Sequence, residues 1–392
     1  RLEQEMMFGR NTAEPRTSDE VVFNHIIEEL DVTKSNTAKL VTFIIDLHAQ
    51  MDLSTVYSGT WSRDYIHLHK TLAKRNERII HYELGDSFTM AFTDNNEVYS
   101  WGTNDFNQLC ASGPDSSFSW GLTRCNVISA MGSKSLKLGS DHGLFLSETN
   151  RLYSWGRNSN GQSGKGSFSP STEFSEILID QPIDSIHCKF NTNFILTKEG
   201  SVYGWPLKSL ESLEGNSVER VRVTPSQIVF PDRVLVKNVS AGNEFSLFLS
   251  EFGLLYSMGR NCMGELGLGD KTPRNSPILV ETLASMQKRV ALISAGFKHA
   301  AVVSTTGNFF VWGSNKSRQL GFPNVRCSTL PLELVVPNYE SNRVKIRSVQ
   351  AGFVSTFMLF NDRQVYYTGL VSNDKGPACV PTLVTYKKIV SL

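Results

Sequence analysis

From residue 79 onward, apolar runs of about one strand's length alternate with short polar turns. A first run enters a turn that usually carries glycine, a second run follows, and a turn such as DNN, TG or EG leads to a third run such as EVYS or LLYS. The apolar positions are continuous or recur every second residue, never with the period of 3.6 of a helix. Runs joined by Gly, Asn and Asp are typical of hairpins, so the pattern predicts an all-β array and excludes a helical solenoid.

Six units align on this pattern. The turn position before the second run is occupied by Gly85, Gly139, Lys189, Gly242, Gly296 and Gly352. The position 16 residues later is occupied by Trp101, Trp155, Trp205, Met258, Trp312 and Thr368. The intervals between units are 54, 50, 53, 54 and 56 residues, whereas the offset inside a unit is constant. Insertions therefore fall outside the paired strands.

The end of each unit supplies a fourth strand. A polar loop leads to a stretch such as NQLC, GQSG, GELG or RQLG, where glycine permits a positive φ or a close backbone approach. A β-branched or Pro-containing segment follows, such as SPILVETL at 276–283 or LPLELVVP at 330–337, and can pair as an outer strand. Four strands in roughly fifty residues, repeated, predict the blades of a β-propeller.

The repeat resembles that of the RCC1 (regulator of chromosome condensation) family. The resemblance is clearest in LLYSMGRNCMGELGLGD, residues 254–270, and in ISAGFKHAAVVS, residues 293–304, and it spans about residues 79–392. It implies an RCC1-like propeller with seven blades. Because KKIVSL at 387–392 matches only the opening strand of a seventh repeat, either further chain or the N-terminal segment has to complete the ring.

Residues 1–78 form a separate N-terminal segment with two open interpretations. SDEVVFNHIIEEL at 18–30 and TAKLVTFIIDLHAQM at 37–51 fit two short amphipathic helices. Alternatively, LVTFIIDL at 40–47 and TVYSGT at 55–60 are spaced like two strands of the repeat and would help to close the ring. Because the chain starts with Arg1 rather than Met, we expect it to be part of a longer protein.

The third unit departs from the pattern. Lys189 replaces the glycine, Pro206 follows Trp205, and PLKSLESLEGNS at 206–217 replaces the glycine-rich loop. One interpretation is drift at a position that needs only a polar loop, since loops tolerate change. The other is an interaction that is specific to this protein.

Composition and motifs limit the kinds of ligand and reaction that the chain can be expected to support. The net charge of +1 gives no basic surface for nucleic acid, and no apolar run is long enough to span a bilayer. Six scattered cysteines lack metal-ligand spacing, and we expect reduced thiols. GQSGKGS at 161–167 and GELGLGD at 264–270 imitate nucleotide loops, but the repeat explains their glycines. We therefore expect no catalytic residue, no cofactor and no metal, and an intracellular location in the cytoplasm or the nucleus.

Equivalent turns of a closed ring share one end of its channel, so the residues beside the turns form a candidate docking surface of mixed charge. The predicted partner-binding residues are Asp86, Asp141, His142, Asn243, Glu244, Lys298 and His299. The two histidines have a second interpretation, because other units carry Phe at the same position. In that case the imidazoles pack inside the ring.

These observations favour a non-enzymatic protein-interaction module. The resemblance implies an alternative, because the founding member of the family is a guanine-nucleotide exchange factor for the small GTPase Ran. That activity would need a protruding wedge and an acidic patch, and residues 206–227 are the only wedge-sized segment. A third role in the family, ultraviolet sensing, would need several Gly-Trp-Arg-His turns, whereas this chain has only GFKH at 296–299.

Overall fold

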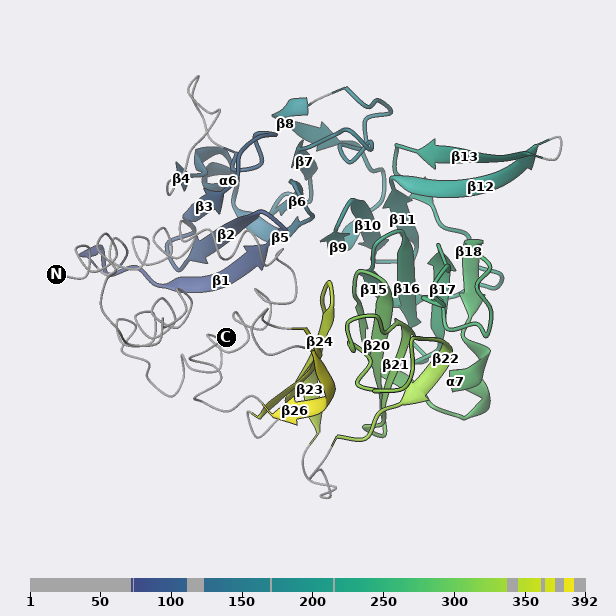
Figure 1. Ribbon diagram of the computed structural model, residues 1–392. Coiled ribbons are helices and arrows are strands. Elements are labelled where there is room, and N and C mark those ends of the chain that lie inside the picture. The colour runs from purple at the N-terminus through teal and green to yellow at the C-terminus, as the bar shows by residue number, and fades with distance from the viewer. Residues whose placement is uncertain are drawn as a thin grey trace, which may run out of the picture.

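The computed structural model describes residue 72 and residues 74–110, 123–169, 171–213, 216–336, 345–360, 364–370 and 377–383. These ranges contain six four-stranded sheets, one separate hairpin and two short helices. The sheets follow one another around a ring, from the purple first sheet through teal and green to the yellow sixth (Figure 1). We number them blades 1 to 6. They confirm the propeller that the repeat predicts.

Each blade runs from an inner strand to an outer strand, and neighbouring strands are antiparallel. Blade 1 contains β1 (Ile79–Leu84), β2 (Phe88–Thr93), β3 (Val98–Gly102) and β4 (Thr123–Arg124). Blade 2 contains β5 (Ser133–Leu138), β6 (His142–Ser147), β7 (Leu152–Gly156) and β8 (Ser171–Ile177). Blade 3 contains β9 (Ile183–Lys189), β10 (Thr192–Thr197), β11 (Val202–Trp205) and β14 (Ser226–Gln227).

The second half of the ring repeats this order. Blade 4 contains β15 (Val236–Ala241), β16 (Phe245–Ser250), β17 (Leu255–Gly259) and β18 (Arg274–Leu279). Blade 5 contains β19 (Val290–Ala295), β20 (His299–Ser304), β21 (Phe309–Ser314) and β22 (Cys327–Glu333). Blade 6 contains β23 (Ile346–Ala351), β24 (Ser355–Phe360), β25 (Val365–Gly369) and β26 (Ala378–Leu383).

The second strand of each blade is apolar on both faces because both faces are covered by neighbouring blades. In blades 1, 2, 4 and 5 every residue of this strand is buried. The two-residue turns that follow depend on residues that accept a positive φ, such as Asn150 at 63° and Gly307 at 89°. Neighbouring inner strands contact one another around the ring, so the core is divided among the boundaries between blades.

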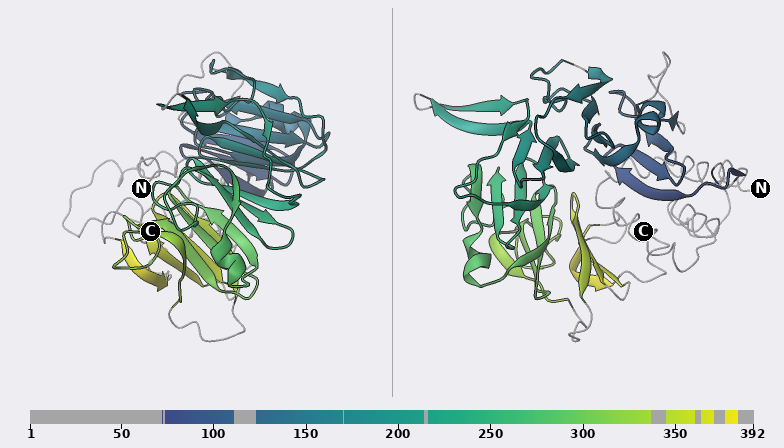
Figure 2. Two further views of the ribbon diagram at one scale, coloured as in Figure 1. Left: turned by 90° about the vertical axis from the view of Figure 1, so that its right-hand side faces the viewer. Right: turned by 180° about the vertical axis from the view of Figure 1, so that it is seen from behind.

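The third blade carries the insertion that the sequence indicates. Between β11 and β14 the chain forms the two-stranded hairpin β12 (Leu207–Leu213) and β13 (Asn216–Arg222). This hairpin extends away from the ring, as both face-on views show (Figures 1 and 2). The segment is therefore a regular β-hairpin rather than an irregular loop.

The two segments predicted to pair as outer strands, 276–283 and 330–337, overlap the C-terminal parts of β18 and β22. The ETL part of the first belongs instead to the short helix α7 (Glu281–Ser285), and a second short helix, α6 (Asn126–Met131), precedes blade 2. The two interpretations of residues 18–60 and the partial repeat at 387–392 lie outside the described residues.

Candidate functional site

The six turns that follow the inner strands lie at one end of the ring, which we call the turn rim. They begin at Gly85, Gly139, Lys189, Gly242, Gly296 and Gly352. Main-chain hydrogen bonds join neighbouring turns within blades 1 to 3 and within blades 4 to 6. The amide of Asp86 donates to the carbonyl oxygen of Ser140 at 3.2 Å, and the amide of Ser140 to that of Phe190 at 2.7 Å. Asn243 donates in the same way to Phe297 at 3.2 Å.

Glycine begins most of these turns because the neighbouring blade comes too close for a side chain. A Cβ on Gly296 would lie 2.5 Å from the carbonyl oxygen of Gly352 and 2.4 Å from the ring of His299. Real Cβ atoms do not approach other heavy atoms so closely. The repeated glycine is therefore a requirement of blade packing.

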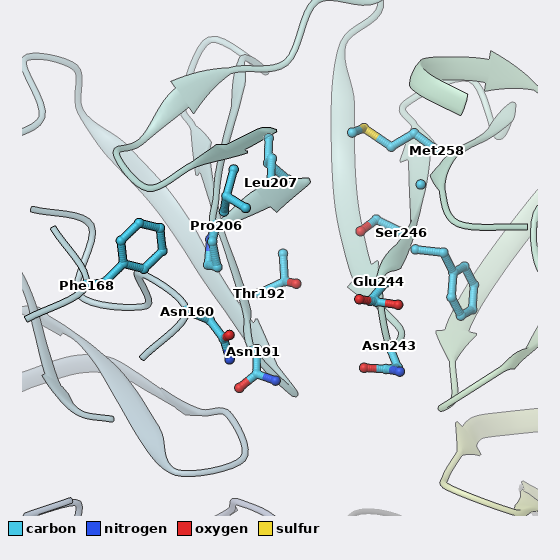
Figure 3. A pocket seen from close by; sticks show the side chains of 13 residues that line it. Asn160, Phe168, Asn191, Thr192, Pro206, Leu207, Asn243, Glu244, Ser246 and Met258 are labelled. Atoms are coloured by element: carbon cyan, nitrogen blue, oxygen red, sulfur yellow. The ribbon is translucent and has the colours of Figure 1, made fainter. Parts of the chain in front are cut away.

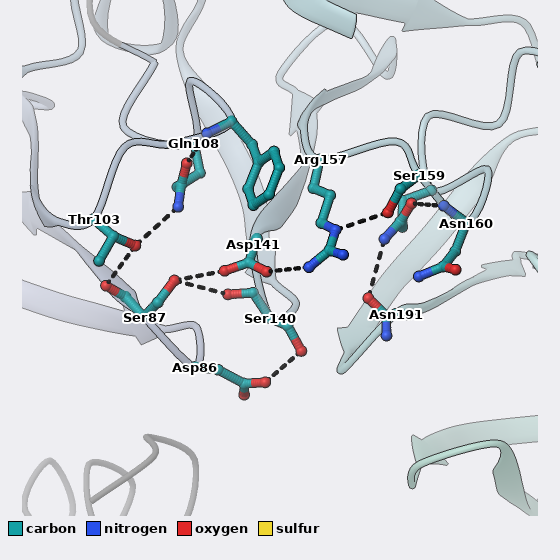
Figure 4. A network of polar contacts seen from close by, with 12 residues as sticks. Asp86, Ser87, Thr103, Gln108, Ser140, Asp141, Arg157, Ser159, Asn160 and Asn191 are labelled. Carbon is teal, nitrogen blue, oxygen red and sulfur yellow. Dashed lines mark hydrogen bonds and ion pairs between the residues drawn. The ribbon is translucent and has the colours of Figure 1, made fainter. Parts of the chain in front are cut away.

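A polar network holds two predicted carboxylates on the turn rim between blades 1 and 2 (Figure 4). The hydroxyl of Ser140 donates to Asp86, and the hydroxyl of Ser87 donates to Asp141 at 2.6 Å. Asp141 also accepts from Arg157 at 3.3 Å. Each carboxylate thus binds a serine of the neighbouring blade, and both remain partly exposed.

The predicted residues of blades 4 and 5 lie on the same rim. Glu244 has a φ of 66° and accepts from Arg260 at 2.6 Å. The ammonium of Lys298 lies 5.6 Å from the ring centre of Phe297, whose ring stacks on Phe353 at 4.9 Å. The rim therefore presents carboxylates, cations and aromatic rings side by side.

The two predicted histidines are completely buried behind the rim. His142 Nε2 is 2.8 Å from Asn193 Oδ1 of blade 3, and His299 Nε2 is 2.9 Å from Thr356 Oγ1 of blade 6. Burial lowers the pKa of His142 to about 4 and that of His299 to about 3, so both imidazoles are neutral at physiological pH. They join neighbouring blades, as the packing interpretation expects, and do not reach the surface.

Lys189, which departs from the glycine pattern, reaches across the ring. Its ammonium donates to the carbonyl oxygens of Ala295 at 2.7 Å and Ala351 at 2.9 Å, at the ends of the inner strands of blades 5 and 6. The ring of Phe190 packs edge-on against Phe297 at 5.5 Å and against Phe353 at 5.3 Å. Blade 3 is therefore attached to the opposite side of the ring.

The tryptophan position and the glycine-rich loop form one contact between neighbouring blades, which we call the seam bond. Trp155 Nε1 donates to the carbonyl oxygen of Gln108 at 2.8 Å, and Trp312 Nε1 to that of Glu265 at 2.8 Å. A Cβ on Gly267 would lie 2.9 Å from Trp312 Nε1, so this loop needs its glycine. The seam bond explains why both motifs recur in the sequence.

A pocket of about 130 Å³ opens between blades 3 and 4 at the base of the hairpin. Figure 3 shows Met258, Ser246 and Glu244 on one wall and Leu207, Pro206 and Thr192 on the facing wall. It is further lined by Phe168, Val221, Asn160, Asn191 and Asn243. The pocket joins the turn rim to the hairpin.

The sequence profile of the RCC1-like domain matches residues 65–358 of the chain. The chain belongs to the RCC1-like domain family. It is 26% identical to the ultraviolet-B receptor UVR8 of Arabidopsis thaliana, over 76% of this chain and 66% of UVR8. It is also 26% identical to the guanine nucleotide exchange factor SRM1 of Saccharomyces cerevisiae, over 62% of this chain and 54% of SRM1. The chain thus spans less than two thirds of either relative.

A solved structure gives the same fold. The crystal structure of human WBSCR16 superposes with a TM-score of 0.67, covering 79% of this chain and 82% of that chain at 20% identity. At this identity the likeness supports the RCC1-like fold and does not assign a function.

Among the described residues of this RCC1-like ring, Cys188 and His142 form a close pair, but the pair does not provide an activated nucleophile. Cys188 Sγ is 3.3 Å from His142 Nε2, but burial raises the pKa of the thiol well above its usual value while it lowers that of the imidazole. Both groups stay neutral, whereas a nucleophilic pair needs a thiolate. The described ranges hold no cluster of His, Cys, Asp and Glu that could bind a metal, and none of their helices is long and apolar enough to span a membrane.

The RCC1-like rim thus brings together the partly exposed predicted residues. A docking role for Asp86, Asp141, Asn243, Glu244 and Lys298 stays a prediction. Sequence reasoning missed the pocket residues Met258, Leu207 and Phe168. A signal was present: Met258 replaces tryptophan in the unit directly after the one that lost its glycine-rich loop. The lost loop would supply the acceptor of a seam bond, and a tryptophan at position 258 would supply its donor.

Proposed function

We infer that this chain is a protein-interaction module whose docking face is the turn rim together with the β12–β13 hairpin. The observation that carries the proposal is the hairpin, which replaces a loop that elsewhere stabilises the ring. Seven residue pairs extend it beyond the blade, far more than a connection from β11 to β14 requires. A projecting ordered element beside a rim of mixed charge is typical of a docking surface.

The rim supports this proposal by being rigid. Main-chain bonds between turns, the serine–carboxylate contacts and the cross-ring bonds of Lys189 fix its side chains before a partner arrives. A preorganised surface loses little entropy on binding. The proposal needs no bond-making chemistry, so no catalytic residue or cofactor is assigned.

A variant with a shortened hairpin tests the proposal. Replacing residues 209–220 by Asn-Gly joins the paired residues Lys208 and Val221 through a two-residue turn and keeps the base of the hairpin. The matched control is Phe252→Ser, which changes a 72% exposed ring in the β16–β17 turn at the opposite end of blade 4.

Both variants and the parent chain are used to capture proteins from a native lysate, followed by mass spectrometry. We expect a partner that binds the parent and the Phe252 variant and is lost from the shortened hairpin. Identical partners on all three proteins would contradict the assignment of the docking face.

A second function, guanine-nucleotide exchange, is favoured by two observations. The hairpin supplies a projecting wedge, and the carboxylates of Asp86, Asp141 and Glu244 lie on one rim. The relative SRM1 is named as a guanine nucleotide exchange factor. An exchange factor acts by binding the nucleotide-free GTPase more tightly than the loaded form, which lowers the affinity for nucleotide by the same factor.

Release of a fluorescent GDP analogue from Ran distinguishes the two functions. Exchange activity predicts faster release with the parent chain, no acceleration with the shortened hairpin, and a complex that is stable in EDTA and dissociated by GTP. Release at the spontaneous rate, together with nucleotide-independent partners in the lysate experiment, would contradict exchange activity and support only the interaction module.

A further inference from the structure

The boundary between blades 3 and 4 lacks the contacts that hold the other described boundaries together. Between blades 2 and 3, Trp205 Nε1 donates to the carbonyl oxygen of Gln162 at 3.0 Å, and between blades 5 and 6 Thr368 Oγ1 replaces the indole and donates to Gln319 at 2.7 Å. Blades 1 and 2, and blades 4 and 5, have the seam bonds given above. At the remaining boundary, Met258 has no N–H or O–H to donate.

Two further contacts are missing at the same place: a main-chain bond that the other described boundaries make, and the imidazole bond that the boundaries 2–3 and 5–6 make. Among the described turns, Phe190 and Asn243 do not make the main-chain bond that joins the corresponding residues of other neighbouring blades. The position of the buried imidazoles is occupied by Thr192 in blade 3, and Ser246 stands opposite in blade 4. Both side chains line the pocket instead of bonding to each other. The pocket is therefore the space that a seam bond would otherwise occupy.

The walls of this space combine apolar and polar groups. Met258, Leu207, Pro206, Val221 and the 53% exposed ring of Phe168 provide the apolar surface. Three asparagine side chains and the carboxylate of Glu244 lie at the mouth, and no cationic side chain lines the pocket. Apolar walls with a few convergent polar groups are typical of a site that binds a ligand.

Size and charge define the occupant. A cavity of roughly 150 Å³ with apolar walls holds one benzene molecule, so about 130 Å³ accepts a single branched or aromatic side chain. Glu244 gives the mouth a negative side, and the neighbouring Arg260 approaches that carboxylate from outside the pocket. A basic residue next to the apolar one is therefore favoured over an acidic one.

We propose that the pocket between blades 3 and 4 is an anchor site for a peptide segment of a protein partner, taking one leucine-sized side chain with a basic residue beside it. The asparagine amides at the mouth can bond to the backbone of that segment. This proposal rests on the proposed function, because it names the chemistry by which the docking face recognises a partner.

The test uses three defined probes: N-acetyl-Leu-Arg-amide, N-acetyl-Leu-Glu-amide and N-acetyl-Ala-Arg-amide. Binding is measured by saturation-transfer NMR on the probe and by the shift of the ¹³C-labelled methyl group of Met258. We expect saturable millimolar binding of Leu-Arg, binding of Leu-Glu about 2- to 5-fold weaker because one exposed ion pair is lost, and no binding of Ala-Arg. In Glu244→Gln the preference for Arg over Glu should disappear or reverse, because Arg260 then loses the carboxylate with which it pairs.

Met258→Trp fills the pocket and should abolish binding of Leu-Arg, while Met286→Trp, the same change on a 52% exposed residue of α7, should leave it intact. Leu207→Asp is a second variant, which places a carboxylate on the apolar wall and should also abolish binding. Thermal unfolding establishes that each variant is folded.

The proposal is overturned if the parent chain does not bind Leu-Arg, if Ala-Arg binds equally well, or if folded Met258→Trp and Leu207→Asp still bind. The shortened hairpin keeps Leu207 and Val221, so it separates the two proposals. If the shortened hairpin captures the same partners as the parent chain while the probe still binds, the proposed docking face alone is contradicted. If the shortened hairpin loses the partner but the parent chain does not bind the probe, the anchor site alone is contradicted.

Discussion

The seam bond predicts an unequal response to the same kind of substitution at two equivalent positions. Trp312 is fully buried, and its Nε1 donates to the carbonyl oxygen of Glu265 at 2.8 Å. Trp312→Phe keeps an aromatic ring but removes the donor. Met258 occupies the same position one blade earlier, where the partner loop is absent. Met258→Phe therefore changes a side chain that has no seam bond to lose.

The cost of Trp312→Phe follows from the structure. A buried carbonyl oxygen that loses its donor costs about 1 to 3 kcal/mol. The smaller ring also leaves space beside Gly267, and a partly relaxed cavity adds about 1 kcal/mol. The sum is about 2 to 4 kcal/mol, which for a propeller of this size lowers the melting temperature by about 3 to 6 °C. Met258→Phe changes volume little at an open pocket and should cost less than about 1 kcal/mol.

Thermal unfolding followed by circular dichroism, at one protein concentration and pH, measures both variants against the parent chain. Trp312→Leu is a useful third variant, because it removes the donor and the ring together and should be at least as destabilising as Trp312→Phe. Equal melting temperatures for Trp312→Phe and Met258→Phe would refute the argument that the indole donor, rather than ring packing alone, stabilises the boundary.

Three further predictions concern the turn rim. Gly296→Ala should lower the free energy of unfolding by more than about 2 kcal/mol, because its Cβ meets a neighbouring blade. Gly307→Ala, with φ 89° but no neighbour within 4 Å, should lower it by about 1 kcal/mol. Urea unfolding measures both values. Lys189→Met removes two bonds across the ring and should destabilise it by about 1 to 3 kcal/mol, and an unchanged midpoint would show that these bonds contribute nothing. Burial lowers the pKa of His299 to about 3, so as the pH falls the unfolded chain is protonated at this residue before the folded chain is. The contribution of His299 to the free energy of unfolding is therefore full above pH 6.5 and falls towards pH 3, by up to about 1.4 kcal/mol per pH unit. His299→Asn should remove its share of this slope between pH 6.5 and 4 and leave the share of His142, whose pKa burial also lowers. An unchanged slope would assign the loss to other groups.

The sequence predicts most of this fold because its signals are local. A hairpin is encoded by two apolar runs and the turn between them, and a constant offset of 16 residues requires the same pairing in every unit. The two helices have five and six residues, too few for helical periodicity to be recognised. The strands of the inserted hairpin carry mixed polar and apolar residues, and this composition is equally compatible with a loop.

The candidate site is less predictable because it depends on contacts between distant units. Equivalence around a ring places Asp141 and Glu244 on one rim, but it does not tell on which side of the turn the imidazoles of His142 and His299 lie. Lys189 resembles drift until its partners are known, and these lie 106 and 162 residues further along the chain. Only the arrangement of blades 3, 5 and 6 around the ring brings them together.

The departures of the third unit are therefore connected. The hairpin takes the place of the loop that would accept a seam bond from blade 4, and Met258 no longer has to be a tryptophan. The part of that boundary next to the turn rim opens into the pocket. Farther from the rim, the boundary keeps its apolar packing around Phe194 and Phe248, whose rings meet edge-on at 5.7 Å. Lys189 and Phe190 then hold blade 3 from across the ring. It follows that a ligand bound in the pocket should partly restore the free energy of unfolding that Lys189→Met removes, because the ligand and Lys189 both hold blade 3 in place.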